Sequence, residues 1–138
     1  MARRKRSQTT VTPRAKVWLE VDGNYVFGLG ICAILEAVEQ NGTIKEAAAA
    51  IGKSYRHVWS RIKEVERAIG ISLVSTQRGG AADTRRSDLT EPARQLVASY
   101  RDLRAQVFSL VEGPFSSSIQ EIVTRAANTR AAKKSING

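Results

Sequence analysis

The residues with the clearest capacity for chemistry are hydrogen-bond donors gathered in one stretch, residues 53–67. This stretch holds five cations: Lys53, Arg56, Arg61, Lys63 and Arg67. Guanidinium and ammonium groups donate to phosphates and to base edges, so the pattern favours a nucleic-acid-binding surface. Only Glu64 and Glu66 oppose them within the stretch. The alternative is an ordinary helical hairpin whose charged face is simply solvated.

Catalytic chemistry finds little support in the same sequence. The chain has one histidine, His57, and one cysteine, Cys32, and its carboxylates are not clustered. These residues supply neither a nucleophile with its base nor a set of metal ligands. We therefore expect no enzymatic activity, no metal and no cofactor. Cys32 is expected to be a small, partly buried residue of a helix.

Two helices must position the cations. Thr43 is a suitable N-cap for the first, with Glu46 three residues later as in a capping box, and Gly52 ends it. Ser54 is a suitable N-cap for the second. An apolar stripe of helical period then follows at Val58, Ile62, Val65 and Ile69. A short helix, a glycine turn and a longer basic amphipathic helix predict a helix-turn-helix.

The first turns of the second helix in such a motif reach base edges in the major groove. We predict that the residues facing bases are Ser54, Tyr55, Arg56, His57 and Ser60. We predict that the residues facing phosphates are Lys45, Lys53, Arg61 and Lys63. Tyr55 and Trp59 could each pack inside or contact the duplex, and His57 could equally be solvated.

A basic loop follows the helix-turn-helix. Residues 73–76 predict a short strand, residues 77–86 a glycine-containing loop, and residues 87–89 a returning strand. Strand, basic loop and strand after a recognition helix indicate a wing, although a mobile surface loop would share this composition. The predicted DNA contacts of the wing are Arg78, Gly79, Gly80, Arg85 and Arg86.

Two further elements precede the motif. Residues 17–21 and 25–27 alternate around Asp22-Gly23, which predicts a small hairpin. Residues 29–41 predict a helix closed by Gly42, with an acidic outer face. The expected fold class is therefore mainly α with small β elements, a winged helix-turn-helix with a long C-terminal dimerisation helix.

The long helix is predicted over residues 90–112, capped by Thr90 and stopped by Gly113-Pro114. Its apolar residues recur at alternating threes and fours: Ala93, Leu96, Tyr100, Leu103, Val107 and Leu110. This heptad seam needs a partner surface. The partner could be the domain itself, but a second copy is the more economical explanation. We predict a homodimer formed through Leu96, Tyr100, Leu103, Val107 and Leu110.

The charge of the chain is concentrated at its ends. The 138 residues carry a net charge of +9. Residues 1–14 read as a disordered basic arm, which could contact phosphates or merely aid solubility. Residues 15–112 read as the domain, and residues 113–138 as a basic tail with a possible short helix over 118–132. No apolar run predicts a membrane span or a signal peptide, so we expect a cytoplasmic, nucleoid-associated protein with no membrane partner.

Several stretches together resemble a known family: KVWLEVDGNYVFGLG, ILEAVEQNGTIKEAAAAIGKSYRHVW, SLVSTQRGG and DLTEPARQLVASYRDL. They are similar to the N-terminal domain of ModE-type, molybdate-responsive transcriptional regulators, over about residues 15–112. A more distant resemblance is to the LysR-type winged helix. The resemblance implies a homodimeric winged-helix DNA-binding domain, dimerised through its first and last helices.

The chain departs from that family pattern in three places. Its wing is less rich in glycine over residues 81–86, and Pro92-Ala93 stands where relatives usually have a glycine. Too few residues follow Glu112 for the molybdate-binding domains, so we expect no molybdate binding. The predicted function is a sequence-specific regulator that binds double-stranded DNA as a homodimer. The competing functions are a non-specific architectural DNA-binding protein and a protein-interaction adaptor.

Overall fold

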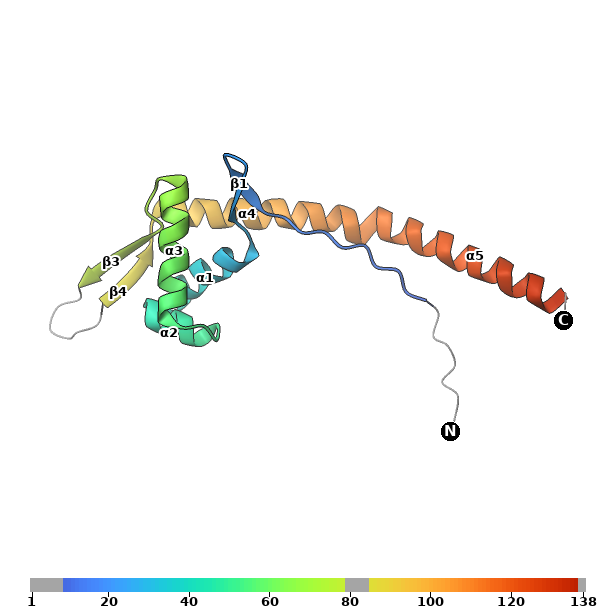
Figure 1. The fold of residues 1–138 in the computed structure, drawn as a ribbon, viewed down its shortest axis with the longest axis horizontal. Helices are drawn as coiled ribbons and strands as arrows, with labels where there is room; N and C mark the ends of the chain where they lie inside the picture. The colour runs from blue at the N-terminus through green and yellow to red at the C-terminus, as the bar shows by residue number, and fades with distance from the viewer. Residues whose placement is uncertain (1–8, 79–84, 137–138) are drawn as a thin grey trace, which may run out of the picture. The chain divides into compact units, whose positions relative to one another are not determined.

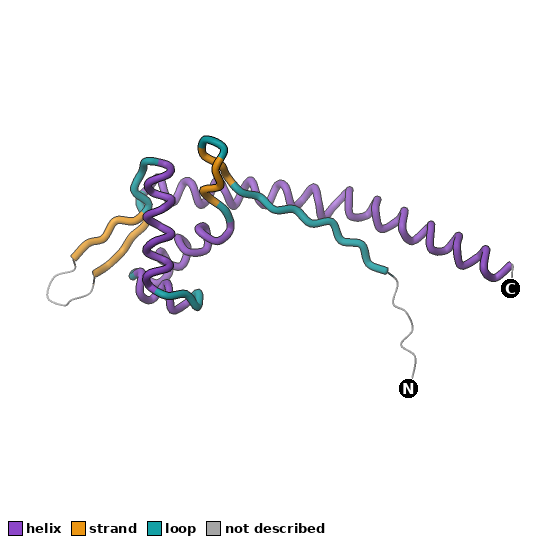
Figure 2. The backbone as a smooth tube through the Cα atoms, viewed as in Figure 1, coloured by secondary structure: helices purple, strands orange, loops and turns teal. Residues whose placement is uncertain are grey.

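The computed structural model describes residues 9–78 and 85–136, and its elements are mainly helical. In chain order they are β1 (Leu19–Val21), β2 (Asn24–Phe27), α1 (Leu29–Asn41), α2 (Ile44–Ala50), α3 (Tyr55–Ile69), β3 (Val74–Arg78), β4 (Arg85–Leu89), α4 (Glu91–Leu110), a π-helical turn (Val111–Phe115) and α5 (Ser116–Ile136). The chain divides into two compact units, residues 17–104 and residues 1–16 with 105–138. Figure 1 labels these elements except β2 and the π-helical turn, and Figure 2 colours the chain by type of secondary structure.

The first unit is a winged helix-turn-helix, which confirms the predicted fold class. Both predicted N-caps of the motif form: Thr43 Oγ1 accepts from the Glu46 N–H at 3.0 Å, and Ser54 Oγ accepts from the His57 N–H at 3.0 Å. Each cap satisfies a backbone donor that the helix itself leaves unpaired. Gly42 ends α1 at a φ of 79°, a left-handed conformation that favours glycine. The helix boundaries are therefore set by local residue chemistry.

Two small antiparallel hairpins flank the helices. In the first, β1 pairs with β2 around Asp22 and Gly23, whose φ values of 52° and 81° make the tight turn that was predicted. In the second, β3 pairs with β4 as the wing. The strands of this second hairpin extend further than the predicted residues 73–76 and 87–89. Figure 1 shows the wing projecting from the helices of the unit.

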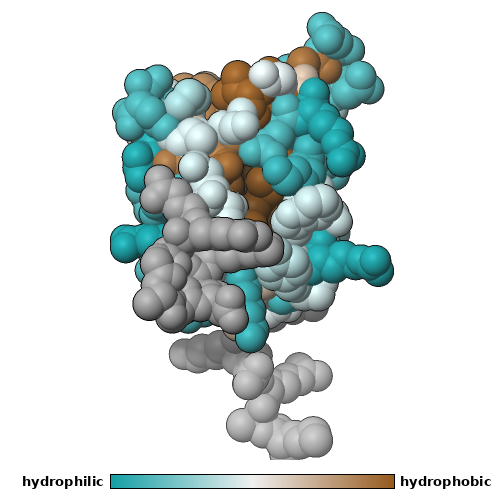
Figure 3. All heavy atoms as spheres, turned by 90° about the vertical axis from the view of Figure 1, so that its left-hand side faces the viewer, coloured by the Kyte–Doolittle hydropathy of each residue, from teal (hydrophilic) through white to brown (hydrophobic). Residues whose placement is uncertain are grey.

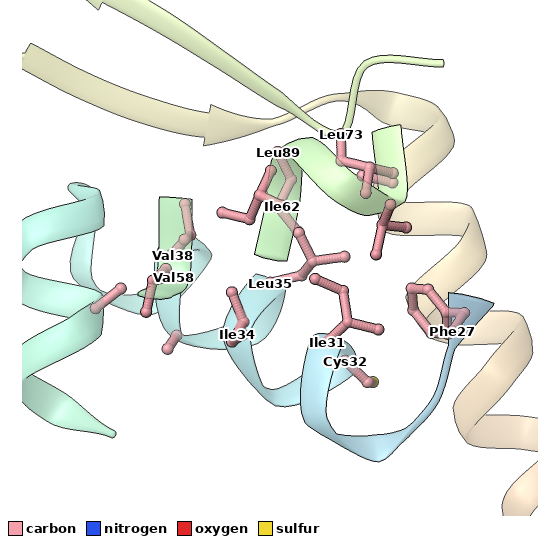
Figure 4. Close-up of a cluster of buried hydrophobic side chains, with 14 of the residues drawn as sticks. Phe27, Ile31, Cys32, Ile34, Leu35, Val38, Val58, Ile62, Leu73 and Leu89 are labelled. Atoms are coloured by element: carbon pink, nitrogen blue, oxygen red, sulfur yellow. The ribbon is translucent and has the colours of Figure 1, made fainter. Parts of the chain in front are cut away.

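A single apolar core joins these elements, as Figure 4 shows. The stripe on α3 is buried at Val58, Ile62 and Val65, and it packs with residues of α1, the wing root and α4. Each large apolar side chain that is fully buried contributes about 1.5–3 kcal/mol to folding relative to its exposed state. Cys32 lies in this core with no exposed surface. Its burial, and to a smaller extent its hydrogen bond to Glu36, raise the pKa of its thiol to about 11.

The acidic outer face of α1 forms ion pairs with α4. Arg94 Nε donates to Glu39 Oε1 at 2.9 Å, and the Arg101 guanidinium pairs with Glu36. These side chains remain exposed enough for solvent to screen their charges, so the pairs add little to stability. Their main effect is to align α4 against α1, while the core supplies most of the packing energy.

The tail helix of the second unit is longer than the sequence predicts. Residues 9–16 follow an extended path (Figure 2), and the Gln120 side chain of α5 bonds to Thr9 and Val11. Residues 1–8 lie outside the described part. The tail helix α5 covers Ser116–Ile136 rather than 118–132. Gly113, at φ −90° and ψ −107°, breaks the helix next to Pro114, but the chain re-enters a helix immediately.

Candidate nucleic-acid interface

The start of α3 presents the predicted base-facing residues to solvent. Ser54, Tyr55, Arg56, His57 and Ser60 are all exposed, while the opposite side of the helix is buried in the core. The unpaired N–H groups of a helix's first turn carry a partial positive charge, which favours a phosphate or another anion there. This end of α3 therefore combines exposed hydrogen-bond donors, the cation Arg56 and the positive end of the helix dipole.

The two aromatic residues of α3 are both accessible to solvent. Tyr55 is 50% exposed and Trp59 is 41% exposed. The Lys63 ammonium lies 5.8 Å from the centre of the Trp59 ring, close enough for a cation–π contact. Neither aromatic ring is a core residue, so both are available to contact a duplex.

Two of the predicted phosphate ligands are free of ion pairs with described residues, and two are engaged within the domain. Lys45 on α2 and Lys53 in the turn are exposed. Lys63 Nζ lies 3.0 Å from Glu66 Oε1, so its charge is partly neutralised. Arg61 is the most strongly engaged of the four.

Arg61 links α3 to the first hairpin. Its guanidinium donates to the Val26 carbonyl at 3.2 Å, lies 3.2 Å from Glu64 and sits 5.9 Å from the centre of the Tyr25 ring. Its side chain is only 21% exposed. A guanidinium placed this way positions the hairpin against α3. No local pattern predicts this role, because Val26 lies 35 residues away in the chain.

The wing is fixed to α3 at its root by one carboxylate. Glu66 accepts from the Leu73 N–H at 2.7 Å and from the Val74 N–H at 3.4 Å, and it also pairs with Lys63. On the other strand, the Ser87 N–H donates to the Gly42 carbonyl at 2.8 Å. Glu66 was not predicted as a site residue, because in the sequence it is simply one of two acids on a basic helix.

The wing cations are placed unevenly by the structure. Arg78 and Arg85 pair in register as the last described residues before the tip, and Gly79 and Gly80 lie outside the described residues. The Arg86 side chain is 75% exposed, with Asp88 at 3.7 Å. Figure 3 views the wing end of the unit, where hydrophilic side chains surround a smaller hydrophobic area.

The predicted dimerisation seam divides into two parts. Ala93 and Tyr100 are buried within the domain's own core, and Leu96 packs against that core. Leu103 and Leu110 are 42% and 59% exposed, and Val107 is half-buried. The domain itself therefore covers the first half of the seam. The sequence had left open whether the domain or a second copy would cover it. Only the second half remains for a partner.

No metal-binding group of three or more histidine, cysteine or carboxylate side chains occurs among residues 9–78 and 85–136. In the same described residues, every helix is too short or too polar to cross a bilayer.

Comparison with known proteins adds to this geometry. Residues 31–94 match the model of the bacterial regulatory helix-turn-helix protein, LysR family. This region is a LysR-type helix-turn-helix domain. The match begins in α1 and ends in α4, so it includes α2, α3 and the wing.

Individual relatives match parts of the chain. The molybdenum transport protein ModE of Herbaspirillum seropedicae is 34% identical over 74 residues, which are 52% of this chain and 26% of ModE. The chain thus spans about a quarter of that relative's length. Full-length LysG from Corynebacterium glutamicum is 25% identical with a TM-score of 0.45, covering 62% of this chain and 28% of LysG. The BenM DNA-binding domain, in a DNA complex, is 19% identical with a TM-score of 0.49, covering 71% and 98%.

Replacing Glu66 with glutamine should destabilise the LysR-type domain by about 1.5–3 kcal/mol at neutral pH, because hydrogen bonds to a charged group are lost at the wing root. Partial burial raises the pKa of Glu66, but the bonds from Leu73, Lys63 and Val74 outweigh it and hold the pKa below 4.5. The stabilisation is therefore present above 4.5 and disappears as the pH falls through the lowered value. Urea denaturation at neutral pH and at a pH below the lowered pKa of Glu66 measures this change in the free energy of unfolding.

Glu64→Gln is the matched control for this experiment. Glu64 lies two residues away on the same helix, and its side chain is 71% exposed. We expect a change within about 0.5 kcal/mol, as for most surface substitutions. Equal effects of the two substitutions at neutral pH would show that Glu66 does not anchor the wing.

Proposed function

We propose that this protein is a sequence-specific, DNA-binding transcriptional regulator that acts as a homodimer. The observation that carries the proposal is the exposed first turn of α3 in a LysR-type domain. Ser54 caps this turn, Arg56 and His57 project from it into solvent, and the apolar stripe opposite is buried. A helix anchored on one side and rich in donors on the other is suited to the major groove.

The contacts fall into two classes. Exposed donors of the first turns, Tyr55, Arg56, His57 and Ser60, read base edges. Phosphates are bound by Lys45 and Lys53, and on the wing by Arg86 with Arg78 and Arg85. Arg61 and Lys63 drop out of the second class, because their charges are already engaged by Val26, Glu64 and Glu66.

Homodimer formation is supported by the apolar residues that α4 leaves uncovered. Leu103, Val107 and Leu110 recur at spacings of four and three, and the two leucines are largely exposed. A parallel or antiparallel copy of the same helix would remove them from water, with about 25 cal/mol gained per Å² of apolar surface. A twofold dimer in turn implies that the operator is an inverted repeat.

Selection of bound sequences from a pool of random duplexes tests the proposed DNA reading. We expect enrichment of one motif arranged as an inverted repeat. Recovery of unenriched sequences would reject sequence-specific reading and favour a non-specific architectural protein. Failure to retain any duplex at moderate salt would favour an adaptor.

The dimer makes a separate prediction. Light scattering at micromolar concentration should give a mass about twice the 15.1 kDa of one chain. Changing both Leu103 and Val107 to glutamate should yield the monomer, because two charges would be buried without partners in the interface. The matched control changes Ala98 and Ala105 to glutamate on the exposed opposite side of α4. A wild-type protein that stays monomeric, or a control that dissociates equally, would contradict this interface.

A further inference from the structure

Nearly all of the net charge lies in the unit formed by the arm and α5. Residues 1–16 and 105–138 hold ten lysine and arginine residues against two acids, Glu112 and Glu121, a net charge of +8 out of the chain's +9. Residues 17–104 hold twelve cations and eleven acids, a net charge of +1. The unit of residues 17–104 is therefore close to neutral, and the other unit governs the long-range attraction of the chain for anions.

The arm is held against α5 rather than dispersed. Gln120 Oε1 accepts from the Val11 N–H at 2.9 Å, and Gln120 Nε2 donates to the Thr9 carbonyl at 2.9 Å. Along residues 11–16, half-buried side chains alternate with exposed ones, and Arg14 and Lys16 are on the exposed side. The Gln120 clamp therefore holds the stretch that carries Arg14 and Lys16 at α5.

The second half of α5 is itself cationic. Arg125 pairs with Glu121 at 2.8 Å, but both side chains are about 70% exposed, and such a pair is weak enough to exchange for another anion. Arg130, Lys133 and Lys134 are exposed, and no described carboxylate forms an ion pair with them. Arg130 and Lys134 also line an open hollow with Ala126, Ala127 and Ala131. Small side chains between cations leave room for a phosphate to approach.

We propose that residues 9–16 and α5 together form a second DNA-binding element that contacts backbone phosphates without reading sequence. The proposal extends the proposed function, since it assigns specificity to α3 and most of the electrostatic affinity to this unit. A membrane-surface helix would need large apolar side chains opposite its cations. The cationic half of α5 has only alanines and small polar residues there, which favours a hydrated polyanion.

The test measures the affinity of the full-length chain for a random duplex by fluorescence anisotropy at several salt concentrations. Each lost phosphate contact lowers the slope of log K against log salt by about 0.9. Replacing Arg125, Arg130, Lys133 and Lys134 with glutamine should lower this slope by about 2–4. The ratio between operator and random affinities should stay unchanged. Circular dichroism checks that α5 remains helical.

A charge-neutral variant tests the clamp separately. Gln120→Ala keeps every cation but releases the arm, and it should weaken random-duplex binding by about three- to tenfold through lost preorganisation. Gln95→Ala, the same change at an exposed position of α4, should have no effect. Equal affinities for the Gln120→Ala and Gln95→Ala variants would remove the clamp from the proposal.

The outcomes separate this inference from the proposed function. An unchanged salt slope with intact operator preference would overturn only the second element. A slope that falls in the absence of any preferred sequence would leave the element standing and reject sequence-specific regulation. Loss of binding to phosphatidylserine vesicles in the glutamine variant, with random-duplex binding unaffected, would replace DNA by a membrane surface and overturn the proposal.

Discussion

Arg56→Ala should reduce the affinity ratio between operator and random duplex by about five- to 160-fold. Arg56 is exposed on the first turn of α3, where a bidentate contact to a base contributes about 1–3 kcal/mol of discrimination. Its removal should leave random-duplex affinity almost unchanged, because that affinity comes from phosphate contacts. Anisotropy titrations with the selected operator and a scrambled duplex of equal length measure both quantities.

Arg67→Ala is the matched control, since Arg67 lies in the last turn of the same helix and is exposed. It removes the same charge from the same element but at the end remote from the capped turn. We expect it to preserve the ratio. If Arg56→Ala also preserves the ratio, the reading end of α3 has been wrongly assigned.

The second large effect concerns stability, where Tyr100→Ala should cost about 3–5 kcal/mol. Tyr100 is 2% exposed, and its ring meets Phe27 edge-on at 5.3 Å between centroids. Its hydroxyl donates to the Val17 carbonyl at 2.9 Å, which ties the chain before β1 to α4. Removing the ring leaves a cavity and breaks this tie. Urea denaturation monitored by circular dichroism gives the change.

Tyr100→Phe separates the two contributions and should cost only about 1 kcal/mol, the usual net value of one hydrogen bond. The pair of variants also discriminates between two roles of Tyr100. A core residue changes the unfolding free energy of the monomer. If Tyr100→Ala instead left that stability intact and only raised the dimer dissociation constant, the residue would belong to the dimer interface and the core assignment would be wrong.

Local patterns in the sequence were sufficient to predict helices α1, α2 and α3 and their ends. The caps at Thr43 and Ser54 and the left-handed end at Gly42 depend on residues at most four positions apart. The same applies to the tight turn at Asp22-Gly23 and to the buried stripe of α3. Short-range chemistry of this kind is readable from one chain, and it was enough to predict the winged helix-turn-helix.

Only the tertiary structure shows which side chains already contact other groups within the domain. Periodicity shows that residues share a face, but it cannot show what that face contacts. Arg61 was predicted to bind phosphate, but its guanidinium donates to the Val26 carbonyl. The first half of the α4 seam lines the domain's own core. The arm is held by Gln120, more than a hundred residues later in the chain. Contacts over such separations depend on how the elements pack, which no local pattern encodes.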